Sequence, residues 1–267
     1  MKKIVVAVFA GALMMSCGAG KNGKPKPGGG FNLFSVEKDI ELGAQVANEI
    51  ESNPSEYPIL DSASNVQAYK YIYGIRDEIL NTGLVHHKDD FAWRIRIIND
   101  DEILNAFCTP GGYIYFYTGL IHYLDNEAEL AGVMGHEMAH ADLRHSTRQL
   151  TKQFGVQVLL SAVLGDQSAL TQITGGLIAL KFSRAHETEA DRMSVTYLCP
   201  THWPADVGAG FFEKIRDSGT QTPPQFISTH PSHENRIENY HMWAAQDSCE
   251  GDHTHDAAYE NFKKLLK

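Results

Sequence analysis

The sequence predicts an α+β domain that is mainly helical and carries a small β-sheet. Three observations support this fold class. Apolar residues recur at helical spacing over most of the chain after residue 31. Residues 93–98 alternate apolar and arginine side chains, as a half-buried strand does. Residues 106–118 have aromatic and β-branched arms on either side of a Pro-Gly-Gly turn, which is typical of a hairpin.

The helices are placed by the spacing of apolar positions. The best marked begins after Asn126, which forms a capping box with Glu129, and continues to residue 145. An apolar helical stretch at 149–180 is broken near Gly165, and neither half is long enough to cross a membrane. Other helices are expected at residues 36–50, 66–80, 183–198, 207–215 and 233–245. The composition is globular from residue 31 to 267, so one domain is expected there.

The N-terminal segment is expected to be a lipoprotein signal peptide at residues 1–16. Two lysines precede an apolar run at 4–15, and Ser16 places a small residue before Cys17. The segment resembles a bacterial lipobox, in which the cysteine thiol is lipidated and becomes the new N-terminus. The alternative is an ordinary secretory signal with a chance cysteine, since Met14 stands where leucine is more usual.

Residues 17–30 are then the lipid anchor and a flexible tether, because residues 18–30 hold six glycines, three lysines and two prolines. Membrane contact is expected only through this anchor. The expected location is the bacterial cell envelope, on the outer membrane facing the periplasm. The net charge of −10, with no large basic block, argues against a nucleic-acid partner.

Three cysteines remain after Cys17: Cys108, Cys199 and Cys249. An exported protein meets an oxidising compartment, so one pair can form a disulfide. Cys199 and Cys249 both lie near loop signals, whereas Cys108 lies in a strand-like run. A bridge between Cys199 and Cys249 is therefore expected.

The segment His136-Glu137-Met138-Ala139-His140 carries the strongest chemical signal. Side chains four residues apart share a face of a helix, so both imidazoles can point at one metal ion. Glu137 then lies where it can take a proton from a water held at that metal. Catalytic zinc usually has three protein ligands, however, so a third must come from elsewhere.

The sequence offers two possible sources of that third ligand. The extended H-E-x-x-H-x-x-G-x-x-H form fails, because Leu143 occupies the glycine position. A glutamate on a separate helix is available at Glu187, and Asp191 lies four residues later on the same face. Asp191 can accept a hydrogen bond from a ligating imidazole and fix its tautomer. The alternative is that this acidic stretch is only a solvated helix face.

The motif at 136–140, followed by Ser-Arg-Ala-His-Glu-Thr-Glu-Ala-Asp at 183–191, resembles the HtpX-like and CaaX-prenyl-protease-like gluzincin metallopeptidases. Segments at 41–43, 105–120 and 229–237 match the pattern of that family, most closely its soluble exported lipoprotein branch. The resemblance implies a zincin domain with one Zn²⁺ ion. It assigns His136, His140 and Glu187 as zinc ligands and Glu137 as the general base, with Asp191 supporting a ligand.

The substrate groove is less clearly marked. Asn105, Ala106 and Phe107 precede the metal helix and are the candidate edge strand for an extended peptide. The alternative is a hairpin whose aromatic residues only pack in the core. His230 precedes a proline and so lies on a loop. The family resemblance implies that it stabilises the oxyanion or occupies the open zinc position, and the alternative is a solvated loop histidine. Arg236 follows, and its charge would assist substrate binding.

Other histidines have weaker support. His186 and His233 are expected at the surface. His253 and His255 would bind metal loosely or belong to a mobile acidic tail.

The sequence thus predicts a zinc-dependent endopeptidase that hydrolyses peptide bonds in misfolded or mislocalised envelope proteins. Its catalytic residues are expected to be Glu137, His230 and Asp191, and its substrates unfolded or extended polypeptides. The substrate class follows from the resemblance and from no individual residue. The alternative is a non-hydrolytic chaperone or assembly factor of the envelope that uses the same groove for binding.

Overall fold

The computed structural model describes residue 32 and residues 34–218, 225–231 and 235–266 of the chain. The predicted signal peptide, Cys17 and the tether lie outside these residues. Within the described ranges, no helix is both long enough and apolar enough to span a bilayer.

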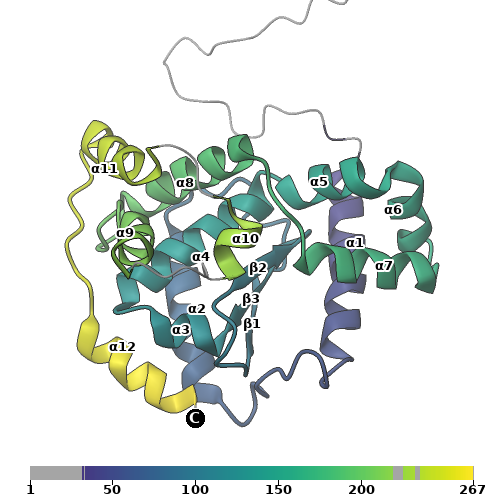
Figure 1. Cartoon of the computed structure of the whole chain (residues 1–267), viewed down its shortest axis with the longest axis horizontal. Helices are drawn as coiled ribbons and strands as arrows, with labels where there is room; N and C mark the ends of the chain where they lie inside the picture. The colour runs from purple at the N-terminus through teal and green to yellow at the C-terminus, as the bar shows by residue number, and fades with distance from the viewer. Residues whose placement is uncertain (1–31, 33, 219–224, 232–234, 267) are drawn as a thin grey trace, which may run out of the picture. The chain divides into compact units, whose positions relative to one another are not determined.

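A three-stranded sheet forms the centre of the domain (Figure 1). Its strands are β1 (Arg94–Ile98), β2 (Ala106–Thr109) and β3 (Tyr113–Tyr117), in the order β1-β3-β2. β1 runs parallel to β3, and β2 pairs with β3 as the predicted antiparallel hairpin. Gly111 and Gly112, with φ of 73° and 80°, make the turn in a backbone region that few other residues tolerate. β2 is therefore an edge strand of the sheet.

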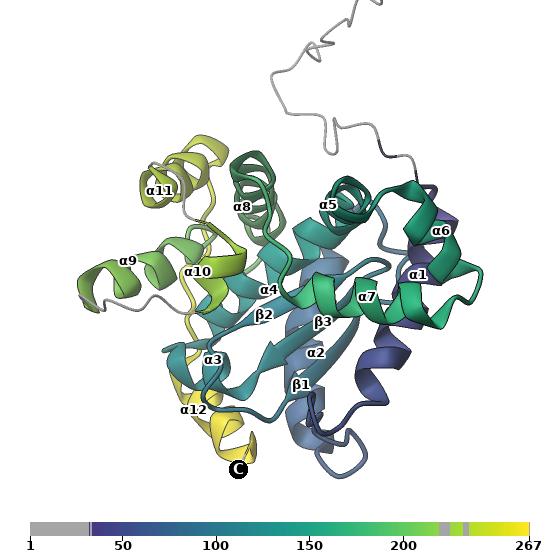
Figure 2. The same ribbon diagram turned by 45° about the vertical axis from the view of Figure 1, so that its right-hand side comes forward.

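Helices cover both faces of the sheet (Figure 2). α2 (Val66–Asn81) and α4 (Glu127–Asp142) pack on the face that presents Ile95, Ile114 and Phe116. α1 (Val36–Glu51), α6 (Val156–Val163) and α7 (Gln167–Ile178) pack on the opposite face, against Phe107, Tyr115 and Tyr117. Along each strand, residues that face the first group of helices alternate with residues that face the second, as the two-residue period of a strand requires.

The remaining helices differ in part from the sequence prediction. They are α3 (Thr118–Tyr123), α5 (His145–Phe154), α8 (Arg184–Leu198), α9 (Gly208–Ser218), α10 (Gln225–Thr229), α11 (Arg236–Asp247), α12 (Asp256–Lys263) and a 3₁₀ turn (Lys264–Leu266). The helix expected at 126–145 ends at Asp142, because Arg144 takes a left-handed φ of 59° and the chain turns into α5. Gly155, with φ of 81°, likewise separates α5 from α6.

α4 is the helix around which the site is built. Asn126 caps its first turn by accepting a hydrogen bond from the backbone of Glu129 at 2.9 Å. Two glycines allow neighbouring helices to come close. A Cβ on Gly135 would lie 2.9 Å from Ser194 Oγ of α8, and one on Gly132 would lie 3.0 Å from Val207 before α9. α4 therefore packs closely against α8 and the start of α9, and α8 supplies a candidate ligand.

Candidate metal centre

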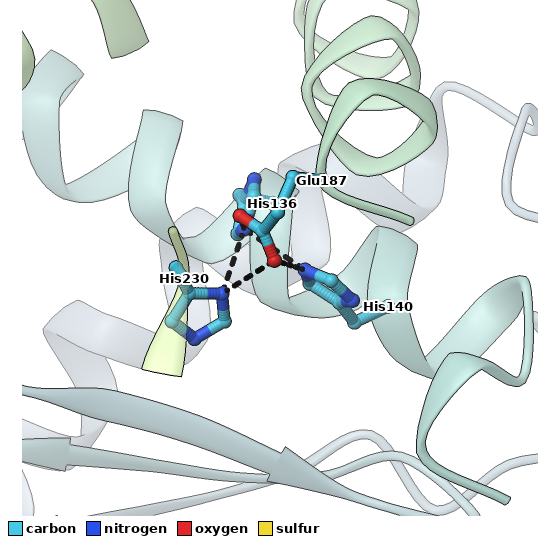
Figure 3. Close-up of side chains that lie close together, drawn as sticks. All are labelled: His136, His140, Glu187 and His230. Atoms are coloured by element: carbon cyan, nitrogen blue, oxygen red, sulfur yellow. Dashed lines mark hydrogen bonds and ion pairs between the residues drawn. The ribbon is translucent and has the colours of Figure 1, made fainter. Parts of the chain in front are cut away.

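Four side chains from three parts of the chain meet above the sheet (Figure 3). His136 and His140 come from α4, Glu187 from the first turn of α8, and His230 from the residue after α10. We call these four residues the catalytic cluster. Each offers one ligand atom, all lie within 4.8 Å of one another, and no side chain is more than 3% exposed.

The spacing of the ligand atoms suits a small tetrahedral ion. His136 Nε2 lies 3.0 Å from His140 Nε2 and 3.2 Å from His230 Nδ1. Glu187 Oε1 lies 3.3 Å from His140 Nε2 and 3.2 Å from His230 Nδ1. Ligands at zinc distances on the corners of a tetrahedron stand about 3.3–3.5 Å apart. Nitrogen atoms and a carboxylate in this arrangement are the donors that zinc prefers, so the residues fit a zinc ion.

His136 is held in place by an acidic partner. Its Nδ1 lies 2.8 Å from Asp191 Oδ1, which also accepts hydrogen bonds from Arg236 and Tyr240, each at 2.7 Å. A carboxylate at Nδ1 favours the tautomer with the proton there, which leaves Nε2 free for the metal. The structure thus places Asp191 where the sequence interpretation required it.

His140 is oriented by residues that the sequence interpretation missed. Its Nδ1 lies 3.0 Å from His145 Nδ1, and His145 Nε2 lies 3.0 Å from Glu189 Oε2. Burial lowers the pKa of His145 to about 4, so its ring is neutral near pH 7 and can accept the proton of His140 Nδ1. The signal in the sequence is a third histidine five residues after His140, which the structure places at the start of α5.

Arg236 lies behind the ligand carboxylate and is 3% exposed. Its guanidinium contacts Glu187 Oε2 at 3.1 Å and Asp191 Oδ1 at 2.7 Å. Burial opposes ionisation of Glu187, but the charge of His230 and hydrogen bonds from His140 and His230 outweigh it and hold the pKa of Glu187 well below its usual range. These contacts suit Arg236 to positioning two carboxylates, whereas the sequence interpretation grouped it with substrate-binding residues.

Glu137 is fully buried beside the cluster, and both its oxygens lack a conventional hydrogen-bond donor within the described residues. His230 Nε2 is nearby, 3.4 Å from Oε1. The thiol of Cys108 is also close, and its pKa is raised by burial and by the charge of Glu137. A buried carboxylate costs free energy unless something satisfies it, so its oxygens are available to a water or a reacting group.

The predicted peptide-binding strand is covered in this structure. Asn105, Ala106 and Phe107 are each no more than 5% exposed, although β2 is an edge strand. α10 lies near this edge, because the backbone of Phe226 donates to Leu104 O at 3.1 Å. Both polar atoms of the Asn105 side chain are buried without a hydrogen-bond partner among the described residues. α10 therefore lies beside the start of β2 and, through Phe226 stacked on His230, beside the catalytic cluster as well.

The other predicted positions are spread over the domain. Cys199 and Cys249 are joined by a disulfide, and Cys108 is a buried free thiol. His186 is half-buried and stacks on His145 with ring centroids 4.4 Å apart. His253 and His255 lie away from the catalytic cluster, next to His202. His233 and the predicted helix start at 232–234 lie outside the described residues.

Comparison with known proteins adds an independent observation. Residues 74–244 match peptidase family M48. The chain is 32% identical over 224 residues to the beta-barrel assembly-enhancing protease of Escherichia coli (strain K12). The matched segment covers 77% of this chain and 44% of that protein. It is 32% identical over 152 residues to the mitochondrial metalloendopeptidase OMA1 of Arabidopsis thaliana, covering 56% of this chain and 31% of that protein. The mitochondrial metalloendopeptidase OMA1 of Schizosaccharomyces pombe is 30% identical over 242 residues, which cover 88% of this chain and 69% of that protein. The chain thus spans less than half of the first two of these relatives.

Proposed function

This chain belongs to peptidase family M48, and from that membership we propose that it is a zinc-dependent endopeptidase of the cell envelope. One observation carries the proposal. Two histidines and a glutamate converge at zinc-ligand spacing, and the buried carboxylate of Glu137 stands beside them with its oxygens free to act. A site built only to hold a structural metal has no use for that carboxylate.

Different residues of the chain hold the metal, transfer the proton and orient the ligands during hydrolysis. A zinc ion at His136, His140 and Glu187 supplies Lewis-acid polarisation of the scissile carbonyl and lowers the pKa of water to near neutrality. Glu137 takes the proton of the attacking water and delivers it to the leaving amine. Asp191 holds one ligating imidazole in the required tautomer, and His145 holds the other.

His230 controls access to the open position of the zinc. Its Nδ1 lies 3.2 Å from both His136 Nε2 and Glu187 Oε1, so it would serve as a fourth ligand and hold the enzyme latent. After withdrawing from that position, His230 would stabilise the oxyanion, which is the second role that the sequence suggested. Because His230 follows α10 directly, displacement of α10 would free the zinc and uncover the β2 edge together.

The substrate is an extended polypeptide that exposes apolar side chains. An edge strand binds such a chain through its main-chain groups, and β2 offers the edge. An apolar pocket beside His136 is lined by Val133, Phe211, Phe212 and Phe226, among other residues. Its volume of about 10 Å³ is too small for a side chain in this structure, so it would accept an apolar side chain of the substrate only after Phe226 moves away. Unfolded proteins expose both features, so misfolded or mislocalised envelope proteins are the proposed substrates.

The cellular setting is proposed from the N-terminal sequence. We assign the chain to the exported lipoprotein branch of the HtpX-like members, with Cys17 as the lipidated residue and the outer membrane facing the periplasm as its location. The Cys199–Cys249 disulfide supports an oxidising compartment. Mass spectrometry of the mature N-terminus tests this assignment, and an unmodified Cys17 would contradict it.

The enzymatic proposal is tested with the purified protein and two variants. Wild type and Glu137→Gln should bind the same amount of zinc at the catalytic cluster, but only wild type should cleave casein. His230→Ala should cleave faster than wild type if His230 keeps the enzyme latent, and more slowly if its main role is at the oxyanion. If neither wild type nor His230→Ala cleaves an unfolded substrate while both hold zinc, the non-hydrolytic chaperone or assembly factor becomes the better explanation.

A further inference from the structure

We propose a second metal site at the N-terminal end of α4, formed by Glu127, His202 and His255 and suited to zinc or a similar divalent transition metal. These three residues, called here the α4-start cluster, each place a ligand atom within 4.8 Å of the other two. Glu127 is the first residue of α4, His202 follows α8, and His255 immediately precedes α12. None of them belongs to the catalytic cluster or to the proposed peptide groove.

His202 is arranged as a metal ligand. Its Nδ1 lies 2.5 Å from Glu78 Oε1, so the ring proton belongs on Nδ1 and the lone pair on Nε2. Nε2 points toward Glu127 Oε1 at 3.9 Å, beyond hydrogen-bond distance. This buried nitrogen has no hydrogen-bond partner among the described residues. A carboxylate behind one ring nitrogen and an unused lone pair on the other is the arrangement that metal-binding histidines share.

Glu127 is fixed by two donors and keeps coordinating capacity. Tyr71 donates its hydroxyl to Oε2, and Trp203 Nε1 donates to Oε1 at 3.0 Å. The side chain is only 12% exposed. A glutamate in the first turn of a helix is stabilising without any metal, because it faces the positive end of the helix dipole. That role explains the residue type, but it does not explain two imidazoles gathered at the same carboxylate.

Backbone contacts bring His255 to this place. His253 N donates to His202 O at 3.0 Å, and Glu127 N donates to Thr254 O at 3.1 Å. His255 itself takes a left-handed φ of 55°, which is unfavourable for a residue with a side chain. Its ring lies edge-on to His202 with centroids 4.7 Å apart. The chain is therefore held against α4 in a conformation that directs this imidazole toward His202.

The donor set selects the kind of metal. Two imidazoles with one carboxylate favour zinc, copper or nickel, whereas calcium and magnesium prefer sites made of oxygen ligands. His202 and His255 remain partly exposed, so the ion can exchange with solvent and water can complete its coordination. Bound there, the ion would fasten the segment before α12 to the first residue of the helix that carries His136 and His140.

Zinc counting separates this site from the catalytic cluster. The full chain is equilibrated with excess zinc, freed of loosely held ions, and measured by mass spectrometry of metals. Wild type should hold two ions per chain, and His202→Gln with His255→Gln should hold one. The double variant His136→Ala with His140→Ala should also hold one ion, because it loses the ion of the catalytic cluster and keeps that of the α4-start cluster. His122→Gln, at a partly exposed histidine with only a distant partner at 3.7 Å, is the matched control and should hold two.

The outcomes distinguish failure of this proposal from failure of the proposed function. If the His202 and His255 variant binds as much zinc as wild type, the second site does not exist, whatever the catalytic cluster does. If the His136 and His140 variant binds as much as wild type, the catalytic assignment fails instead. Glu127→Gln, which keeps an acceptor for Trp203, provides a third variant should the histidine variant misfold. Zinc should also protect residues 250–256 from proteolysis in wild type but not in Glu127→Gln.

Discussion

The catalytic cluster and the α4-start cluster use the same helix and similar donors but differ in how they are built. The catalytic cluster is buried from all sides, and separate partners orient both of its α4 imidazoles. In the α4-start cluster Glu127 and His202 have such partners, whereas His255 is positioned by backbone contacts of its segment and by the rings of His202 and His253. The first is a site prepared before its ion arrives. The second is completed only when the C-terminal segment docks.

This difference suggests different purposes for the two sites. Reactive chemistry requires ligands held rigidly and shielded from water, and burial with oriented partners provides both. A site between two distant parts of the chain gains from exchange, because ion binding and docking then stabilise one another. We therefore expect changes at the first cluster to alter the reaction and changes at the second to alter stability and C-terminal order.

The strongest test of this division uses two glutamates on one helix. Glu137→Gln should lower casein cleavage by about 10²- to 10⁴-fold, the usual contribution of a general base. Glu127→Gln should leave the rate per folded molecule within the error of wild type, because Glu127 lies at the far end of α4 from the catalytic cluster. Steady-state cleavage with the folded fraction measured by circular dichroism makes the comparison. An equal loss in both variants would mean that the two clusters are not separable.

The disulfide provides the next test, because it fastens the C-terminal segment that carries His255. It joins Cys199 to Cys249 across 50 residues, and His255 follows shortly after. Chain-entropy arguments for a loop of this length give a stabilisation of about 4 kcal/mol. Cys199→Ser with Cys249→Ser should lower the free energy of unfolding by up to that amount in urea titration. It should also weaken zinc binding at the α4-start cluster but not at the catalytic cluster.

A control for the disulfide variant is Cys108→Ala, which removes the buried free thiol. Its small volume change should cost less than the loss of the bridge and should leave zinc binding at the α4-start cluster intact. If the disulfide variant loses both ions equally, its effect is general destabilisation of the domain and carries no information about docking.

The two clusters were not equally accessible to prediction from the sequence. His136, Glu137 and His140 belong to one helix, so their spacing alone brings them together. Glu187 is a candidate ligand from the acidic stretch that it shares with Asp191, and the resemblance to a family assigns it that role. The strands and most helices followed from local periodicity in the same way. Glu127, His202 and His255 come from three segments joined only by tertiary packing, which no local pattern records. The sequence therefore predicts only loose metal ligands or a mobile acidic tail for His253 and His255.

The same reasoning explains two smaller differences. α12 was not expected, because Tyr259 and Phe262 are too few apolar positions to mark a helix, yet both are buried in the core. Arg236 was grouped with substrate-binding residues because its charge alone is visible in the sequence. Its burial against Glu187 and Asp191 depends on the packing of α11 on α8, which the sequence does not show.

Removing the partner of a ligating histidine should weaken the catalytic cluster measurably. Asp191→Asn keeps the size of the side chain but can no longer hold the Nδ1 proton of His136 as a carboxylate does. Loss of such a partner typically costs 10- to 100-fold in metal affinity. Competition with a chromogenic chelator should show that loss at the catalytic cluster. The matched control is Asp206→Asn. Asp206 Oδ2 lies 2.7 Å from Nδ1 of the exposed His241, away from both clusters, so this change should leave zinc affinity unchanged.

The corresponding change at the α4-start cluster is Glu78→Gln, and its effect should be smaller. Glu78 supports His202 as Asp191 supports His136, but its side chain is 36% exposed, so water can replace part of its hydrogen bond. We expect a loss of about tenfold in zinc affinity, at the lower end of the range for such partners. Glu213→Gln, at another exposed glutamate near a histidine, controls for the change in surface charge. If Glu78→Gln matches the loss in Asp191→Asn, solvent exposure does not weaken the support of a ligand, and the contrast between a prepared and an assembled site must be given up.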